Sequence, residues 1–191
     1  MADFSALTGL AQLPELLRAT ITFLQERGAP SEALAILHKG RGIGPLRTAP
    51  YLVRVGQAWR LGVLLLDAEG ELYATGEVTR AVEPKVAVTN RSLAADRRRE
   101  FRRAAVRGKF AEGETINHGF TPLVLDAAGL TGSLAAETTT TGSDAVSPLS
   151  LRDDTVLVAW GSNAATGFAG LMPLGHYLAE RAVILAPVGA S

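Results

Sequence analysis

Arginine is concentrated in one stretch of the sequence, residues 92–107, which has the periodicity of an amphipathic helix. At 100° per residue a small apolar face centres on Phe101, and three arginines lie on the opposite face at i, i+4 and i+8. These arginines are Arg99, Arg103 and Arg107. A guanidinium group binds two oxygens of a phosphate or carboxylate and keeps its charge at physiological pH. The row therefore predicts an anion-binding surface.

Other interpretations of this arginine row stay open. Asp96 and Glu100 could leave it an ordinary solvated face, or it could dock on the acidic part of the chain. Residues 1–109 hold 17 basic and 11 acidic side chains, whereas residues 110–191 hold 2 basic and 8 acidic ones, although the total net charge is zero. If the row instead faces a partner, that partner is a nucleic acid, a smaller anion or an acidic protein. We do not expect nucleic acid.

A second candidate for anion binding is the glycine-rich stretch His38–Pro45, with Gly40, Gly42 and Gly44 at alternate positions. Alternate glycines let backbone N–H groups approach an anion closely, and Lys39 and Arg41 would add charge. The stretch lacks the features of a dinucleotide-binding turn or a P-loop, which need a preceding strand or a terminal Gly-Lys-Ser/Thr. A flexible connector between a helical hairpin and a sheet is the alternative.

Among the three histidines, His118 is the best candidate for acid–base chemistry, because Glu112 and Glu114 precede it closely. Two carboxylates in a glycine-containing loop do not define a metal site, so we predict no metal ligands and no catalytic residues. Asp153-Asp154, directly before an expected strand, is typical of a turn. We expect no cofactor.

Two types of element would position these side chains in the N-terminal half. Apolar residues at helical spacing from Leu13 to Leu24, and again from residue 31 to 37, predict a helical hairpin over residues 13–38. Residues 51–66 and 71–79 favour strands, joined by the turn signal Asp67–Gly70. A short edge strand over residues 86–89 would follow, and then the basic helix begins at Ser92.

Further elements follow in the C-terminal half. We expect strands over residues 123–125, 155–160 and 182–185, a helix over 174–180 opened by Pro173, and a polar loop over 131–147. Strands and helices do not alternate regularly, so the predicted class is α+β: an N-terminal helical hairpin packed on a mainly antiparallel sheet, with a basic amphipathic helix. We expect a single domain over residues 1–191, with subdivision at 48/49 as an alternative.

Composition limits the function classes. The chain has 191 residues and no cysteine, which excludes disulfides, thiolate metal sites and a cysteine nucleophile. No apolar run approaches the ~20 residues of a membrane helix, and the first residues do not have the pattern of a signal peptide. Sixteen of the 19 basic residues are arginine, which is typical of a GC-rich bacterial genome. We expect a soluble bacterial protein in the cytoplasm.

The sequence alone does not establish a function. The absence of a catalytic signature favours a binding or assembly domain without its own catalysis. The alternatives are a small enzyme acting on an anionic or phosphorylated metabolite, and a nucleic-acid-binding protein that uses the basic helix. The segment from Val53 to Thr79 has more apolar side chains than one sheet face can take, which predicts self-association as a homodimer.

Overall fold

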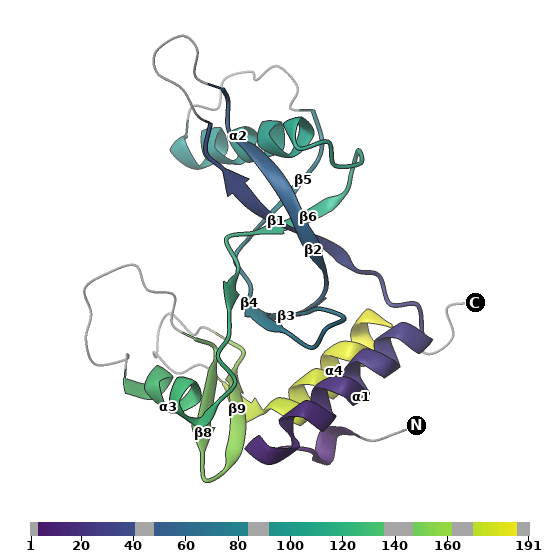
Figure 1. The fold of residues 1–191 in the computed structure, drawn as a ribbon, viewed down its shortest axis with the longest axis vertical. Coiled ribbons are helices and arrows are strands. Elements are labelled where there is room, and N and C mark those ends of the chain that lie inside the picture. Colours follow the sequence, from purple (N-terminus) through teal and green to yellow (C-terminus); the bar gives the residue numbers. More distant parts are fainter. Residues whose placement is uncertain (1–3, 41–47, 84–91, 136–146, 162–169, 187–191) are drawn as a thin grey trace. The chain divides into compact units, whose positions relative to one another are not determined.

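The computed structural model of the chain describes residues 4–40, 48–83, 92–135, 147–161 and 170–186 (Figure 1). These residues form four α-helices: α1 (Leu13–Glu26), α2 (Leu93–Arg107), α3 (Ala127–Ala135) and α4 (Leu174–Leu185). Two 3-10 turns, η1 (Phe4–Ala6) and η2 (Leu10–Gln12), precede α1. The strands are β1 (Glu32–His38), β2 (Tyr51–Leu61), β3 (Leu64–Leu66), β4 (Leu72–Ala74), β5 (Glu77–Arg80), β6 (Thr115–His118), β7 (Thr121–Pro122), β8 (Leu149–Arg152), β9 (Thr155–Ala159) and β10 (Leu171–Pro173).

The predicted α+β class is confirmed. Seven strands form one mixed sheet in the order β5-β6-β1-β2-β3-β4-β7, and three form a second sheet in the order β10-β9-β8. The only parallel pair among the described strands is β1 with β6. No helix of the described segments is long and apolar enough to cross a membrane.

The second helix of the predicted N-terminal hairpin is wrong, because residues 32–38 form strand β1. Ala33, Leu34 and Ala35 are consecutive and all buried, since β1 lies between β2 and β6. A strand buried on both faces gives a continuous apolar run, which periodicity cannot distinguish from a short helix. The first helix is confirmed as α1, and it ends before Gly28, whose φ of 58° suits glycine.

The predicted hairpin over residues 51–79 is only partly right: β2, β3 and β4 form a meander with an additional turn, whereas residues 77–80 form β5, which pairs with β6 at the other end of the sheet. β2 and β3 are joined at Gly62, which has a φ of 66°, and the predicted Asp67–Gly70 turn joins β3 to β4. The basic helix is confirmed as α2, and the Ser92 hydroxyl accepts a hydrogen bond from the N–H of Ala95. The expected strand at residues 86–89 lies outside the described residues.

The C-terminal half differs from the prediction at three points. The strand expected at residues 123–125 is wrong, because β7 covers Thr121–Pro122 instead. The strand expected at 182–185 is also wrong, because α4 continues to Leu185 with Leu174, Leu178 and Ala182 buried at helical spacing. The expected loop after residue 131 begins later, since α3 extends to Ala135, and residues 136–146 lie outside the description. The strand at 155–160 is confirmed as β9.

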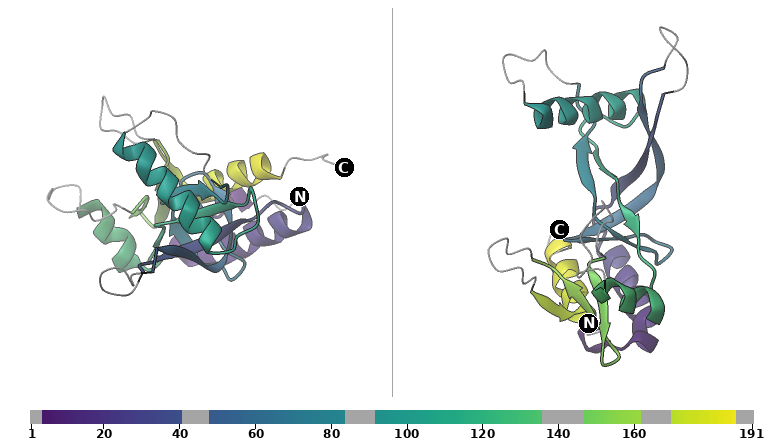
Figure 2. Two further views of the ribbon diagram at one scale, coloured as in Figure 1. Left: turned by 90° about the horizontal axis from the view of Figure 1, so that it is seen from above. Right: turned by 90° about the vertical axis from the view of Figure 1, so that its left-hand side faces the viewer.

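The chain divides into two compact units. Unit 1 comprises residues 1–30, 59–74 and 121–191, and unit 2 comprises residues 31–58 and 75–120. In unit 1, α1 and α4 lie side by side (Figure 1), and the core consists mainly of leucines. In unit 2, α2 lies across the strands (Figure 2), and alanines allow this close approach. The core of unit 2 contains Ala33, Ala35, Leu52, Ala81, Ala104, Ala105, Phe110 and Ile116. The predicted single domain would contain both units.

Candidate functional site

The predicted arginine row occupies the side of α2 away from the packed alanines. Arg103 and Arg107 are exposed, and the Arg107 Nε donates a hydrogen bond to the carbonyl oxygen of Pro50 at 2.7 Å. Arg99 is partly buried and forms an ion pair of 2.6 Å with Asp96, one turn earlier. Asp96 therefore offsets part of the charge of the row. Anion binding by these three residues stays a prediction.

The glycine-rich stretch connects two paired strands. β1 ends at His38 and β2 begins at Tyr51, and the rings of these two residues stack with centroids 4.9 Å apart. A connector from a helical hairpin to the sheet is therefore wrong, because the preceding element is a strand. Lys39 is exposed directly after β1, while Arg41 lies outside the described residues.

A hollow of about 280 Å³ in unit 2 brings together basic and apolar residues from three elements. We call it the β5–α2 groove. Its residues are Glu77, Val78, Thr79, Arg80 and Val82 in and after β5, Arg98, Phe101 and Arg102 on α2, and His118 at the end of β6. A second hollow of about 450 Å³ shares Glu77, Phe101 and His118 with it and adds the apolar residues Ile36, Leu37 and Phe120.

His118 forms part of the floor that both hollows share. Its side chain is only 4% exposed, and its ring stacks on Phe101 with the centroids 4.1 Å apart and the planes 24° apart. Burial lowers the pKa of His118 below its usual value, and Arg97 lowers it further, whereas Glu77 acts in the opposite direction. The imidazole is therefore uncharged at neutral pH. It forms no hydrogen bond within the described part of the chain.

The carboxylate beside His118 is that of Glu77, because antiparallel pairing of β5 with β6 places these two residues opposite each other. Glu77 forms an ion pair of 2.6 Å with Arg97, whose guanidinium lies 5.8 Å from the centroid of the Phe101 ring. The negative charge of Glu77 is thus already matched by one arginine. The other arginines of the groove have no such partner within the part of the chain that the structure describes.

Arg98 and Arg102 lie one helical turn apart on α2, and both are exposed. The side chains of these two arginines and of Arg80 in β5 form no ion pair or hydrogen bond with the described residues. The groove therefore combines an apolar floor with a net positive charge. Such an arrangement can bind a carboxylate or phosphate, because guanidinium groups donate paired hydrogen bonds to two oxygens.

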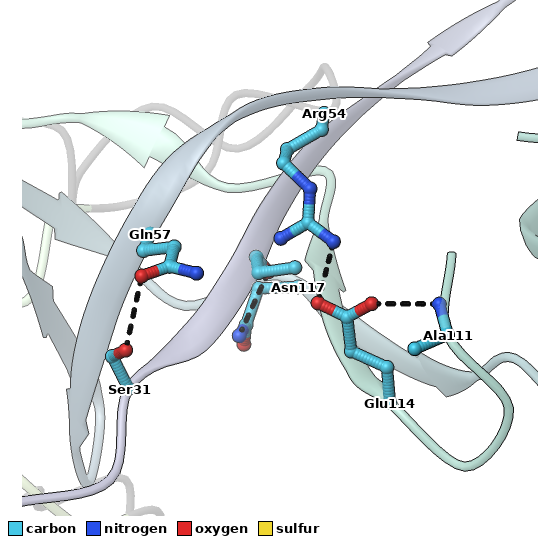
Figure 3. A network of polar contacts seen from close by, with 7 residues as sticks. Ser31, Arg54, Gln57, Ala111, Glu114 and Asn117 are labelled. Atoms are coloured by element: carbon cyan, nitrogen blue, oxygen red, sulfur yellow. Dashed lines mark hydrogen bonds and ion pairs between the residues drawn. The ribbon is translucent and has the colours of Figure 1, made fainter. Parts of the chain in front are cut away.

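Sequence reasoning identified His118 but assigned it the wrong carboxylates. Glu114 accepts hydrogen bonds from Arg54 at 2.6 Å and from the N–H of Ala111 at 3.0 Å (Figure 3). It therefore stabilises the turn that precedes β6. In the same region, the buried Asn117 donates a 2.7 Å hydrogen bond to Glu32. Glu114 is therefore engaged in structure, and only the pairing of β5 with β6 could reveal Glu77 as the neighbour of His118.

The sequence analysis also missed Arg98 and Arg102. On a helical wheel they lie 60° and 100° from Phe101, at the border of the packed face and not opposite it. A border position on a helix that covers a sheet is where a side chain reaches a groove, and this is the signal that could have indicated them. Three or more metal-ligating side chains do not converge anywhere in the described residues.

A larger hollow, of about 760 Å³, lies in unit 1 between α1, the β3–β4 turn and the start of α3. Its basic residue, Arg18, is accompanied by the acidic residues Glu69 and Asp126. Asp126 is already engaged, since its Oδ1 accepts a 2.7 Å hydrogen bond from the N–H of Gly129 at the start of α3. This hollow therefore has no excess of positive charge comparable to that of the β5–α2 groove.

The chain matches no protein-family model, no curated protein and no solved structure. Its function has to be inferred from the geometry and charge of the groove.

Proposed function

We propose that this is a binding protein whose unit 2 recognises an anionic group, a carboxylate or a phosphate, in the β5–α2 groove. The observation that carries the proposal is the pair Arg98 and Arg102, which line the groove without a partner among the described residues. Like charges at i and i+4 destabilise a helix by roughly 0.2–0.5 kcal/mol. A bound anion would offset this repulsion.

The remaining residues of the groove suit this role. Phe101 and the uncharged His118 provide a flat, desolvated floor that strengthens hydrogen bonds between an anion and the arginines. The volume of about 280 Å³ is close to the lower limit of small-molecule pockets, which run from about 300 to 1,000 Å³. The groove is thus suited to one anionic group and not to a dinucleotide.

Calorimetric titration with inorganic phosphate and with succinate tests the proposal. We expect binding that the double variant Arg98→Gln/Arg102→Gln weakens at least about tenfold, because a hydrogen bond to a charged group contributes roughly 1.5–3 kcal/mol. Arg103→Gln removes one positive charge from the other side of the same helix, and we expect an effect much smaller than half of that loss in binding free energy. Equal losses in the two variants would favour the arginine row instead, and no binding of either anion would contradict the proposal.

A small enzyme acting on an anionic metabolite is a second candidate function, favoured by one observation. His118 is uncharged and faces both hollows beside Glu77, as a general base requires. Incubation with a set of phosphate esters, followed by ³¹P NMR, would detect turnover. Under this alternative His118→Asn abolishes turnover but leaves phosphate binding within about twofold. Absence of turnover leaves the binding role.

Location and assembly belong to the same proposal. We propose a bacterial cytoplasmic protein, on the basis of the missing cysteines and the strong preference for arginine over lysine.

We also propose a homodimer, tested by light scattering: a mass near twice the chain mass of 20.0 kDa at micromolar concentration supports it, and a mass near 20.0 kDa contradicts it. Leu64, Leu65 and Leu66, which motivated the dimer, are fully buried within one chain, so the interface would lie elsewhere.

A further inference from the structure

The groove runs along β5, which forms an edge of the seven-stranded sheet as far as the described residues go. β5 is the terminal strand of the seven-stranded order and pairs with β6 alone among the described strands. A terminal strand exposes backbone N–H and C=O groups that can pair with another strand. The direction of these groups in β5 follows from its hydrogen bonds.

Alternate residues of β5 direct their backbone groups toward β6. The N–H of Ala81 donates to the carbonyl of Glu114, and the carbonyl of Ala81 accepts from the N–H of Gly113. By the alternation of antiparallel pairing, the backbone N–H and C=O groups of Thr79 and Glu77 also point toward β6. The N–H and C=O of Val78 and the N–H of Arg80 therefore point to the open edge. The carbonyl of Arg80 accepts a 2.8 Å hydrogen bond from the N–H of Val82.

The two faces of the sheet at this edge differ in chemistry. α2 covers the face that carries Glu77 and Ala81, as the ion pair of Glu77 with Arg97 and the packing of Ala81 with the alanines of α2 establish. Successive side chains alternate between faces, so Val78, Arg80 and Val82 lie on the opposite face. Both valines are exposed, by 47% and 37%. A strand added here would meet Arg98 and Arg102 of α2 on one face, and the exposed valines together with Arg80 on the other.

We propose that the ligand of the groove is an extended acidic peptide segment, which adds to β5 as a further strand and places its carboxylates on Arg98 and Arg102. This inference rests on the proposed anion-binding function. The complementary sequence alternates Glu with a β-branched residue such as Val, because alternate side chains face α2 and the exposed valines. Backbone hydrogen bonds provide affinity in such complexes, and alternate side chains provide specificity.

Charge distinguishes the acidic peptide from two other possible occupants of this edge, a second copy of the chain and a nucleic acid. A second copy pairing through β5 would bring Arg80, Arg98 and Arg102 of both chains together, while the acidic residue of the groove, Glu77, is already paired with Arg97 in each copy, so self-pairing at this edge is unfavourable. Nucleic acid would satisfy the arginines but would leave the outward N–H and C=O groups of Val78 without strand partners. An acidic peptide satisfies both.

The test uses the full chain and a fluorescent peptide of nine residues that alternates Glu and Val. Two further peptides carry N-methyl groups either on all the Glu residues or on all the Val residues. N-methylation removes backbone donors, and only one of the two sets faces β5 in an added strand. We expect one methylated peptide to bind at least about tenfold more weakly and the other to bind within about threefold of the parent. Tenfold corresponds to about 1.4 kcal/mol.

Hydrogen exchange gives a second readout that does not depend on a variant. Peptide binding should slow exchange of the amides of Val78 and Arg80, which face the open edge, while the amide of Thr79 is already paired with β6. If phosphate and succinate bind but both methylated peptides bind equally well, strand addition is wrong and the anion site stands. If neither the small anions nor the parent peptide binds, the proposed function itself is wrong.

A titration with labelled single-stranded and duplex DNA at about 50 and 200 mM salt completes the test. Displacement of the peptide by DNA, with affinity falling steeply as salt increases, would overturn the inference in favour of a nucleic-acid surface. Weak signals that do not depend on salt support the peptide.

Discussion

At the residue scale, the environment of His118 makes the stability of the fold depend on pH. The ring is buried against Phe101, and its pKa lies below the usual value because burial disfavours the charged form. The unfolded chain, with an ordinary histidine pKa of about 6.5, then takes up the proton first as the pH falls. The free energy of unfolding should therefore decrease as the pH drops below about 6.5, until the pKa of the folded state is reached.

We predict that His118→Gln removes this component of the pH dependence. The component has a slope of at most about 1.36 kcal/mol per pH unit, since only one proton is involved. Urea unfolding at several pH values between 7.5 and 5, followed by tryptophan fluorescence, measures it. His176→Gln, which changes an exposed histidine on α4, should keep the slope of the wild type. An unchanged slope in His118→Gln would show that His118 titrates normally.

A second residue-scale prediction concerns Tyr73, whose pKa is raised to about 12. Burial is the largest cause, followed by the hydrogen bond that its hydroxyl donates to Asp67 Oδ2 at 2.8 Å. Asp67→Asn should lower this pKa without restoring the usual value of 10.0, because burial remains. Phenolate absorbance after a rapid pH jump measures the titration. The raised pKa contributes stability below pH 10 that is lost as the pH rises toward 12. An identical phenolate titration in the wild type and in Asp67→Asn would show that the hydrogen bond to Asp67 does not raise the pKa of Tyr73.

The candidate site shows how far residue patterns alone can lead. His118 could be selected because histidine is the side chain that most often carries out acid–base chemistry near neutral pH. The helix that carries the arginines could be selected from its periodicity. The relevant arginines could not, because Arg98 and Arg102 become distinct only when β5 and α2 form the groove. Glu77 lies beside His118 through strand pairing, and that non-local contact has no local signal in the sequence.

At the scale of elements, turns and caps were predicted well, because they depend on a few adjacent residues. Ser92 caps α2, Asp67–Gly70 forms a turn, and Asp153-Asp154 connects β8 to β9. Strand β1 was not predicted, since its apolar run fits a helix equally well until β2 and β6 are paired with it. Strand β8 (Leu149–Arg152) was not predicted either, since it lies between the predicted loop over residues 131–147 and the predicted strand over 155–160.

The turn between β8 and β9 yields the third prediction. Asp153 and Asp154 have φ values of 48° and 59°, which is the pattern of a two-residue type I′ turn. Glycine adopts this conformation more easily than aspartate, so Asp154→Gly should raise the free energy of unfolding by roughly 0.5–1 kcal/mol. Asp154→Val, which is β-branched, should lower it by about 1–2 kcal/mol. Urea unfolding measures both, and destabilisation by glycine would contradict the turn assignment.

At the scale of the whole molecule, neither unit is continuous in sequence. The chain passes between the units at residues 30/31, 58/59, 74/75 and 120/121, and β2 extends from unit 2 into unit 1 without a break. Neither unit can therefore be excised as one segment. Loss of structure in the last residues of β2 would remove the strand to which β3 is paired.

The last prediction is that the two units unfold together. Leu24 is fully buried in the core of unit 1, and Leu24→Ala should cost roughly 2–5 kcal/mol. Because both units share the backbone of β2, we expect Leu24→Ala to lower the denaturation midpoint of unit 2 by as much as it lowers the midpoint of unit 1. Fluorescence of Trp59 and Trp160 reports on unit 1, and hydrogen exchange at Ile116 reports on unit 2. Ile116→Ala, in the core of unit 2, provides the reciprocal test. Protection of Ile116 that persists after the tryptophan transition would show that the units are separate domains.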